Sequence, residues 1–513
     1  MAIITNEILI PKKLFSSNVE KDLELDSPLP EYCPDIARII KAECTPFAES
    51  CTVADGKATV CGKAVYDILY ETDYKSRLRC ASFTQDFSCS VPIPRTNAVN
   101  ITAACRVKCE RIGCKLLSPR RAIIKATIGT LFDIEGESAV KAVAATEDKE
   151  AFFRKRTVRF DGKASIAEGD YRFGDLLPLA QSEKSIGEIV CGSVTLQAPQ
   201  LQLTPGKAEI KTTASVCTLC EEENNEGHYF TSVKSLPVSI EYTNDALTAP
   251  NAIELSLTPY GCEFTPELDQ YGESRVVKAA FSVKLRMKIG ETKEYTVADD
   301  MFEKDFDSVP SLASVTFRSL HARSEAGFST DAKLAAFSPK PEYLLDSSVR
   351  VYSSEATRNE DGVLASGSFI VTLLVATAEG VHSFDSVIPY NQLLNPELPE
   401  GEADISCETI PSEVIATLHS DGSATVRVIA STAVQVYTET EESFISEVSK
   451  RIARERRNED DMLIYCFPTD GEDLWSIAKL YRVPPESITE ANPALFDDDG
   501  RIADIERAIL IKP

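Results

Sequence analysis

The side chains that could do chemistry are numerous, but they form no recognisable catalytic set. The chain holds 80 Asp and Glu residues, so neighbouring carboxylates arise by chance and no acid–base pair stands out. Its four histidines are His228, His321, His382 and His419. The chain contains no HExxH motif, phosphate-binding loop, GxSxG motif or dinucleotide-binding glycine pattern. The sequence therefore predicts a protein that is not an enzyme, has no catalytic residue and needs no cofactor.

The cysteines could bind a metal or form disulfides. The chain has 15, and nine of them lie between Cys33 and Cys114. An odd number, together with a start that lacks secretory features, argues against a disulfide framework. Cys217 and Cys220 form one CxxC motif, but no second motif or nearby histidine completes a zinc site. We predict no metal site and interpret the cysteines as small, partly buried strand residues.

The chain is strongly acidic, with a formal net charge of −26 at pH 7. Such a surface repels nucleic acids and anionic lipids and suits a basic protein partner. The start, MAIITNEILIPKKLF, lacks the long apolar stretch and cleavage site of a signal peptide. No run approaches the roughly 18 apolar residues of a membrane span. We therefore expect a cytoplasmic protein that binds no nucleic acid and does not insert into a membrane.

The sequence contains three internal repeats, and their fold determines where the polar side chains lie. Turns at Gly56, Gly206 and Gly362, which are 150 and 156 positions apart, each open a strand, a polar turn and a second strand. A second hairpin follows each time, with its turn residues at 118–120, 271–273 and 420–422. A short matching segment precedes each glycine turn, at 35–40, 185–190 and 342–345. A period of about 150 residues is the size of a domain.

The alternation of apolar and polar residues in these segments is typical of half-buried strands. We predict a mostly β fold of tandem antiparallel β-sandwich or barrel-like repeats, followed by a small C-terminal domain. The edges of such sheets could pair with strands of a partner. The expected repeats cover residues 1–155, 156–305 and 306–440.

Residues 441–461 differ in character from the repeats. Phe444, Ile445, Val448 and Ile452 stand at helical spacing, and a basic cluster is followed by an acidic one. We predict a charged helical linker.

Residues 462–513 resemble a LysM domain, a module of about 50 residues with βααβ topology. The segment 471–481, GEDLWSIAKLY, is similar to the family's Gly-Asp-Thr-Leu-Trp-x-Ile-Ala-x-x-Tyr motif, and 491–493, ANP, matches the end of its second helix. Local chemistry agrees, because Asp473 suits a helix N-cap and Pro485 the first turn of a second helix. Trp475, the only tryptophan, is expected in the core of this domain.

The LysM resemblance implies two loops that bind chains of N-acetylglucosamine. The sequence departs from the family pattern at Glu472 and Asp473, at Pro468 in the first strand, and in an acidic insertion at 497–500. The corresponding residues, which could bind a glycan or a protein partner, are Thr469, Asp470, Gly471, Glu472, Asp473, Leu474, Asn492, Pro493, Ala494 and Leu495.

The segment Leu25–Lys41, LDSPLPEYCPDIARIIK, resembles the signature of the SPOCS domain. Tandem SPOCS-like repeats followed by one LysM domain are similar in architecture to the SipL group of spore coat morphogenetic proteins. The resemblance implies a scaffold in the mother-cell cytoplasm, at the forespore surface during sporulation. Its partner would be the morphogenetic ATPase of the coat basement layer or another coat protein. Binding of peptidoglycan through the LysM loops remains the alternative.

Overall fold

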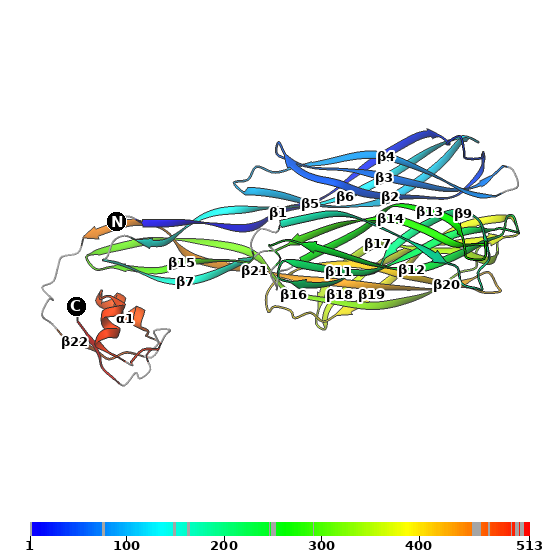
Figure 1. Cartoon of the computed structure of the whole chain (residues 1–513). Helices are drawn as coiled ribbons and strands as arrows, with labels where there is room; N and C mark the ends of the chain where they lie inside the picture. The colour runs from blue at the N-terminus through cyan, green and yellow to red at the C-terminus, as the bar shows by residue number, and fades with distance from the viewer. Residues whose placement is uncertain are drawn as a thin grey trace.

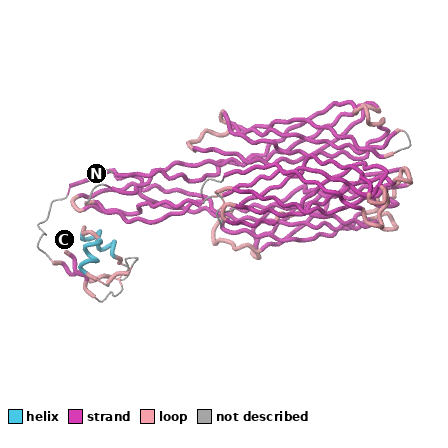
Figure 2. Tube along the Cα trace, viewed as in Figure 1, coloured by secondary structure: helices cyan, strands magenta, loops and turns pink. Residues whose placement is uncertain are grey.

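The computed structural model consists almost entirely of antiparallel strands, which confirms the mostly β prediction (Figure 2). In the part of the chain that it describes, two short helices occur, both close to the C-terminus. The described residues are 3–73, 77–146, 150–161, 165–245, 247, 253–290, 292–453, 463–469, 472–493, 495–497, 502 and 507–512.

The first repeat is a sandwich of two three-stranded sheets. Along its central strand, Val60, Tyr66 and Ile68 point inward and are almost fully buried. They pack against Ile124 and Phe132 of the opposite sheet, so the period-two alternation places one apolar face of each sheet in a shared core. The sheets have the orders β1-β6-β5 and β2-β3-β4, with bounds β1 Ile3–Pro28, β2 Ile36–Ala54, β3 Lys57–Thr72, β4 Leu78–Pro92, β5 Val99–Ser118 and β6 Arg121–Thr146.

The second and third repeats follow the same plan. In the second, sheet β13-β14-β8 faces a sheet in which β11 pairs with β12, β10 and β9; in the third, β16-β21-β20 faces β17-β18-β19. The bounds are β8 Ser165–Pro178, β9 Ile186–Leu196, β10 Gln200–Thr204, β11 Lys207–Glu222, β12 Tyr229–Thr243, β13 Ile253–Leu268, β14 Ser274–Ile289, β16 Phe306–Leu334, β17 Pro341–Asn359, β18 Gly362–Thr377, β19 Gly380–Leu394, β20 Asp404–Leu418 and β21 Ala424–Ala453.

The glycine turns lie where the sequence placed them, before the central strand of each repeat. Gly56, Gly206 and Gly362 have φ values of 70°, 79° and 140°, a region that side chains with a Cβ rarely adopt. The turns at 118–120, 271–273 and 420–422 likewise join β5 to β6, β13 to β14 and β20 to β21.

Three long strand pairs extend beyond the sandwiches and form a narrow arm (Figure 1). They are the N-terminal part of β1 with the end of β6, β7 with β15, and the start of β16 with the end of β21. Ile8, Phe160, Val297, Phe317 and Phe444, drawn from all three pairs, share one apolar cluster. The arm therefore has its own core. The bounds of its remaining strands are β7 Ala151–Asp161 and β15 Thr292–Glu303.

The three sandwiches also meet through matching residues. Leu69, Leu219 and Leu374, at matching positions on β3, β11 and β18, lie in one buried cluster. The segments that precede the glycine turns each add a residue to it, namely Ile40, Val190 and Leu345. One chain thus builds an internal three-fold arrangement in which each repeat buries the same part of its surface. We refer to the three repeats and their arm as the body.

Polar contacts join the same surfaces. The backbone N–H of Leu78 donates to the Tyr229 hydroxyl at 2.8 Å, between the first and second repeats. Arg38 donates to the carbonyl of Val381 at 3.0 Å, between the first and third. In both contacts one of the two partners is a backbone group at the interface between repeats.

The helix predicted over 441–461 is wrong for residues 441–453, which continue β21. They pair with β16, as in Ala313 with Phe444 and Leu312 with Ile445. The pairing with β16 supplies partners to the backbone of this segment up to Ala453, apart from two register shifts. Residues 454–461 lie outside the described part. Two expected repeat boundaries also fall inside strands: 155 lies in β7 and 440 in β21.

The C-terminal module has the element order β22-α1-α2-β23, in agreement with the βααβ order expected for it. β22 and β23 pair antiparallel, Ile464 with Ile511 and Cys466 with Ile509. Both helices pack over this small sheet through Ile477, Ala478 and Ile488. The bounds are β22 Ile464–Cys466, α1 Leu474–Tyr481, α2 Pro485–Ala491 and β23 Ile509–Ile511.

Candidate docking module at the tip of the arm

The first predicted loop leads into α1 through a capping box. The carboxylate of Asp473 accepts from the backbone N–H of Ser476 at 2.7 Å, and the backbone N–H of Asp473 donates to the Ser476 hydroxyl at 2.8 Å. The expected N-cap role of Asp473 is therefore confirmed. Before it, the backbone N–H of Thr469 donates to the Glu472 carboxylate at 2.8 Å. These bonds hold Glu472 and Asp473 close to the start of α1, and two of them each engage one oxygen of a carboxylate.

The predicted site residues differ in how accessible they are. Thr469 and Pro493 are exposed, and Glu472, Asp473 and Leu474 are half-buried. Leu495 is buried in the module core. Asp470, Gly471 and Ala494 lie outside the described residues. The surface that the two loops offer is therefore carried by Thr469, Glu472 and Pro493 among the residues that the structure describes.

Asn492 has a structural position inside the module. It is 7% exposed, and its amide nitrogen donates to the carbonyls of Ile488 at 2.7 Å and Leu510 at 2.6 Å. Its amide oxygen accepts from the backbone N–H of Leu510 at 2.7 Å. The side chain thus joins the end of α2 to β23, and its polar atoms are already engaged within the module.

Helix α1 contacts the tip of the arm through Asp300 of β15. The indole N–H of Trp475 donates to one carboxylate oxygen of Asp300 at 2.8 Å, and the ammonium of Lys479 lies 2.6 and 2.8 Å from its two oxygens. Burial alone would raise the pKa of Asp300, but the bonds from Lys479 and Trp475 outweigh it and hold that pKa below its ordinary value. Asp300 therefore binds the module as a carboxylate.

Arg482, just after α1, adds a second polar contact. Its guanidinium donates to the carbonyls of Glu303 at 2.7 Å and Phe306 at 2.9 Å, and to the Asp307 carboxylate at 2.7 Å. Arg482 has a left-handed φ of 60° at the C-cap of α1, which turns the chain sharply at this point. One arginine thus spans the connection between β15 and β16.

An apolar contact completes the junction. The ring of Trp475 lies 5.2 Å from that of Phe302, which in turn stacks on Phe152 at 5.0 Å. Trp475 is half-buried and packs against the module core. The prediction that it serves the core of its own domain was thus incomplete, because it also packs on the arm.

Sequence reasoning missed Asp300, Phe302 and Arg482 as contact residues. Asp300 was hidden among many acidic residues, and Arg482 stands where the LysM pattern places no demand. Trp475 was the one available signal, since aromatic residues are enriched at interfaces.

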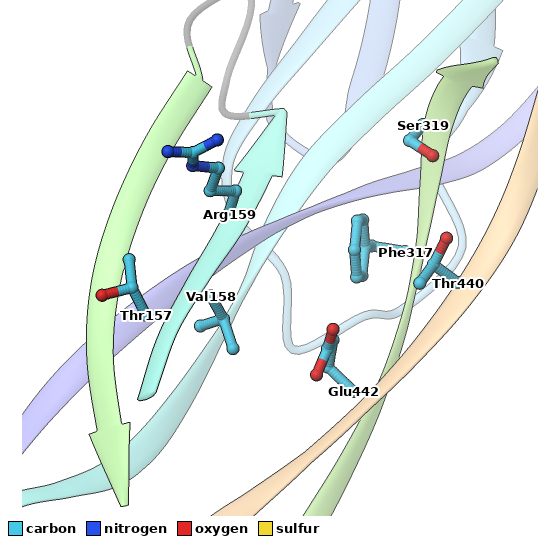
Figure 3. A pocket seen from close by; sticks show the side chains of 7 residues that line it. All are labelled: Thr157, Val158, Arg159, Phe317, Ser319, Thr440 and Glu442. Atoms are coloured by element: carbon cyan, nitrogen blue, oxygen red, sulfur yellow. The ribbon is translucent and has the colours of Figure 1, made fainter. Parts of the chain in front are cut away.

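A shallow pocket of about 370 Å³ lies at the base of the arm (Figure 3). It is lined by Val158 and Arg159 of β7, Phe317 of β16 and Glu442 of β21, among others. Its charged groups already have protein partners, since Arg159 pairs with Glu294 at 2.7 Å and Glu442 with Arg156 at 2.5 Å. The two charged residues that line the pocket are therefore both in ion pairs with other residues of the protein.

Within the described residues, no group of three or more His, Cys, Asp or Glu side chains could hold a metal ion.

His382 lies 3.4 Å from a guanidinium nitrogen of Arg38, at the contact of the first and third repeats. None of the described helices is long and apolar enough to cross a membrane.

Comparison with known proteins gives one match. Residues 35–117 match the family model of the SipL SPOCS domain. They run from the start of β2 into β5, so the match covers the glycine turn, the β3–β4 hairpin and most of β5, and it ends before the turn into β6. This part of the first repeat is therefore similar to the SPOCS domain. Searches of the curated proteins and of the solved structures gave no match.

Proposed function

We propose that this protein is a non-enzymatic scaffold that assembles the spore coat from the mother-cell side of the forespore surface. The match of residues 35–117 to the SPOCS domain carries this proposal. Two further repeats of the same plan surround the matched one, which supports a structural role for the whole body. A body with three shared interfaces and an arm is suited to hold a binding module at a distance from its bulk.

The C-terminal module, of the LysM type in this proposal, docks a protein of the coat basement layer, such as its morphogenetic ATPase. The exposed apolar residues on its surface favour a protein as the partner. Four large apolar side chains on it are 61 to 69% exposed: Leu463, Tyr465, Phe467 and Leu480. In this proposal these side chains contact the partner, because burying exposed apolar surface favours association.

The test is the position of a fluorescent fusion in sporulating cells. The full-length protein is compared with a truncation after Asp461 and with a variant in which Tyr465 and Phe467 are replaced by Ser. We expect the full-length signal to surround the forespore and both variants to be diffuse. A truncated protein that still surrounds the forespore would move the docking role to the body. A full-length protein that never reaches the forespore would rule out the coat role.

Glycan binding is the second candidate, and the βααβ order of the module favours it. Here the ligand would contact the surface of Thr469, Glu472 and Pro493. Calorimetry of the full chain with N-acetylglucosamine oligomers, with the truncation after Asp461 as control, separates the candidates. Heat that depends on the module supports glycan binding, whereas equal traces for both proteins exclude it.

A further inference from the structure

Four cysteines form two pairs between the sheets of the first repeat. Cys44 and Cys51 lie on β2, and Cys105 and Cys109 lie on β5. These strands belong to different sheets and run beside each other along one edge of the sandwich. The thiol of Cys51 is hydrogen-bonded to that of Cys105, and the thiol of Cys44 to that of Cys109. All four are free thiols.

Each pair faces an arginine from another repeat. A guanidinium nitrogen of Arg286, on β14, lies 3.6 Å from the Cys105 sulfur, and the same nitrogen donates to the Cys105 carbonyl at 3.0 Å. The hydrogen bond from Cys51 is the largest influence, and with Arg286 it outweighs burial and lowers the pKa of Cys105 to about 7.

In the second pair, too, the pKa of the β5 thiol is lowered. The hydrogen bond with Cys44 is the first cause that lowers the pKa of Cys109, and the charge of Arg350 on β17 adds to it. The hydrogen bond with Cys109, together with burial, raises the pKa of Cys44. In each pair the β5 thiol thus has a lowered pKa and the β2 thiol a raised one.

Other cysteines lack this combination. Burial raises the pKa of Cys80, and it raises that of Cys191 to about 12. Neither pKa is influenced by a hydrogen bond from another thiol. Cys61 is exposed on β3, with its sulfur 3.8 Å from the Ser88 hydroxyl. Reactivity towards an oxidant requires a thiolate, and disulfide formation requires a second thiol in reach.

We propose that Cys51–Cys105 and Cys44–Cys109 are oxidation sites at which a peroxide forms two disulfides that join β2 to β5. The thiolate of Cys105 attacks one peroxide oxygen, the O–O bond breaks, and the sulfur becomes a sulfenic acid while hydroxide leaves. The Cys51 thiol then attacks that sulfur and forms the S–S bond, while its proton joins the departing hydroxyl group, which leaves as water. In total, two thiols and one hydrogen peroxide give one disulfide and two waters. Cys109 and Cys44 react in the same way.

The disulfides would connect two sheets that no backbone ladder joins at this edge. The connection falls within residues 35–117, the segment of the SPOCS match. Because a cross-link between distant parts of the chain restricts the unfolded state, the oxidised first repeat should resist unfolding and proteolysis more strongly.

The test treats the reduced full chain with a small molar excess of hydrogen peroxide and then blocks the remaining thiols. Mass spectrometry should show a loss of about 2 Da for each disulfide, and peptide mapping should find Cys51 linked to Cys105 and Cys44 linked to Cys109. The variant Arg286→Gln should slow the first linkage several-fold. The control Cys61→Ser, on an exposed thiol of the same repeat, should leave both linkages unchanged.

Two results would overturn the proposal. One is oxidation that occurs first at Cys61 or at another thiol outside the pairs. The other is a Cys51→Ser variant in which Cys105 is linked to a different cysteine at the wild-type rate. The far-ultraviolet circular dichroism of each variant establishes that it is folded. If a serine variant does not fold, the map of the unmodified chain decides the matter by itself.

Discussion

The contacts that hold the body together differ from those that join the C-terminal module to the arm. In the body, matching leucines of all three repeats share one buried cluster, and the arm buries residues from three strand pairs. The module joins the arm through fewer residues, namely the polar bonds of Asp300 and Arg482 and the packing of Phe302 of β15 into the module's apolar cluster, where it meets Trp475. Apolar burial spread over many residues is difficult to undo locally, whereas a few polar bonds can be exchanged for water.

This difference indicates how the two regions behave. The body should unfold as a unit, because removing one repeat exposes the surfaces of the other two. The module should be able to leave the arm while both remain folded. Trp475 reports on this contact, because it is the only tryptophan of the chain and lies at the junction. The predictions below use its emission together with the strand signal of the body.

The largest expected effect is in the core of the second repeat. Phe281 is 1% exposed and lies 5.9 Å from the ring of Phe173. Phe281→Ala should lower the free energy of unfolding by about 3 to 5 kcal/mol, because it leaves a cavity. In urea, the loss of strand signal and the change in Trp475 emission should both shift to lower concentration.

Leu176→Ala is the matched control, since this leucine of the same repeat is 56% exposed. It should change the free energy of unfolding by about 0.5 kcal/mol at most. A strand signal that is lost in separate steps in Phe281→Ala would show that the repeats unfold independently.

The repeats were predictable because their signals are local. Gly56, Gly206 and Gly362 mark turns that need a positive φ, and alternation marks the strands beside them. The arm was not predictable in this way. β1 pairs with β6 more than 90 residues along the chain, as Pro28 does with Arg121, and no short window of sequence records such a partner.

The error at 441–453 has a specific cause. The ladder between β16 and β21 shifts register between Ser311 and Leu312, so Ser446 has no partner there and β21 carries a bulge. Ile445 and Val448 then stand two rungs apart and share one apolar cluster. Because of the bulge, two apolar residues three positions apart lie on the same face of a strand, and this spacing is also typical of a helix.

The candidate site could be predicted only in part. The cap at Asp473 follows from local chemistry, and the order of the module's elements agrees with the motif. The role of Asn492 inside the module, and the contact of Trp475 with the arm, depend on which elements meet in space. A motif names residues but does not show which of their atoms are already bonded.

The second prediction separates the module from the body. Asn492→Ala removes three buried hydrogen bonds and leaves the Leu510 backbone without its side-chain partner. The module should lose about 2 to 3 kcal/mol of stability. On heating, Trp475 emission should shift to the red before the strand signal falls.

Pro493→Ala, at the exposed neighbouring residue, serves as the control and should leave both transitions in place. If Asn492→Ala lost the two signals together, the module would be part of the same cooperative unit as the body.

The third prediction breaks the contact alone. Asp300→Ala removes the acceptor for both Trp475 and Lys479, and bonds to a charged group contribute about 1.5 to 3 kcal/mol. We expect red-shifted Trp475 emission at neutral pH, with the thermal transition of the body unchanged. Small-angle scattering should show a larger maximum dimension.

The matched control is Asp331→Ala, which removes a carboxylate paired with Arg427 at 2.7 Å far from the junction. Its Trp475 emission should equal that of the wild type. An unchanged spectrum in Asp300→Ala would mean that the apolar contact with Phe302 is sufficient to hold the module.

The smallest effect should come from pH, because protonating Asp300 leaves the Arg482 and Phe302 contacts in place. The pKa of Asp300 is below its ordinary value when the module is docked. The undocked form therefore takes up its proton first as pH falls, so the stabilisation is complete above about pH 4 and is lost as pH falls through the lowered pKa. Trp475 emission should accordingly move to the red in acid below about pH 4, in a reversible step. The same titration of Asp300→Ala should lack this step; if it keeps it, another carboxylate at the junction titrates and the contact depends less on Asp300 than its geometry indicates.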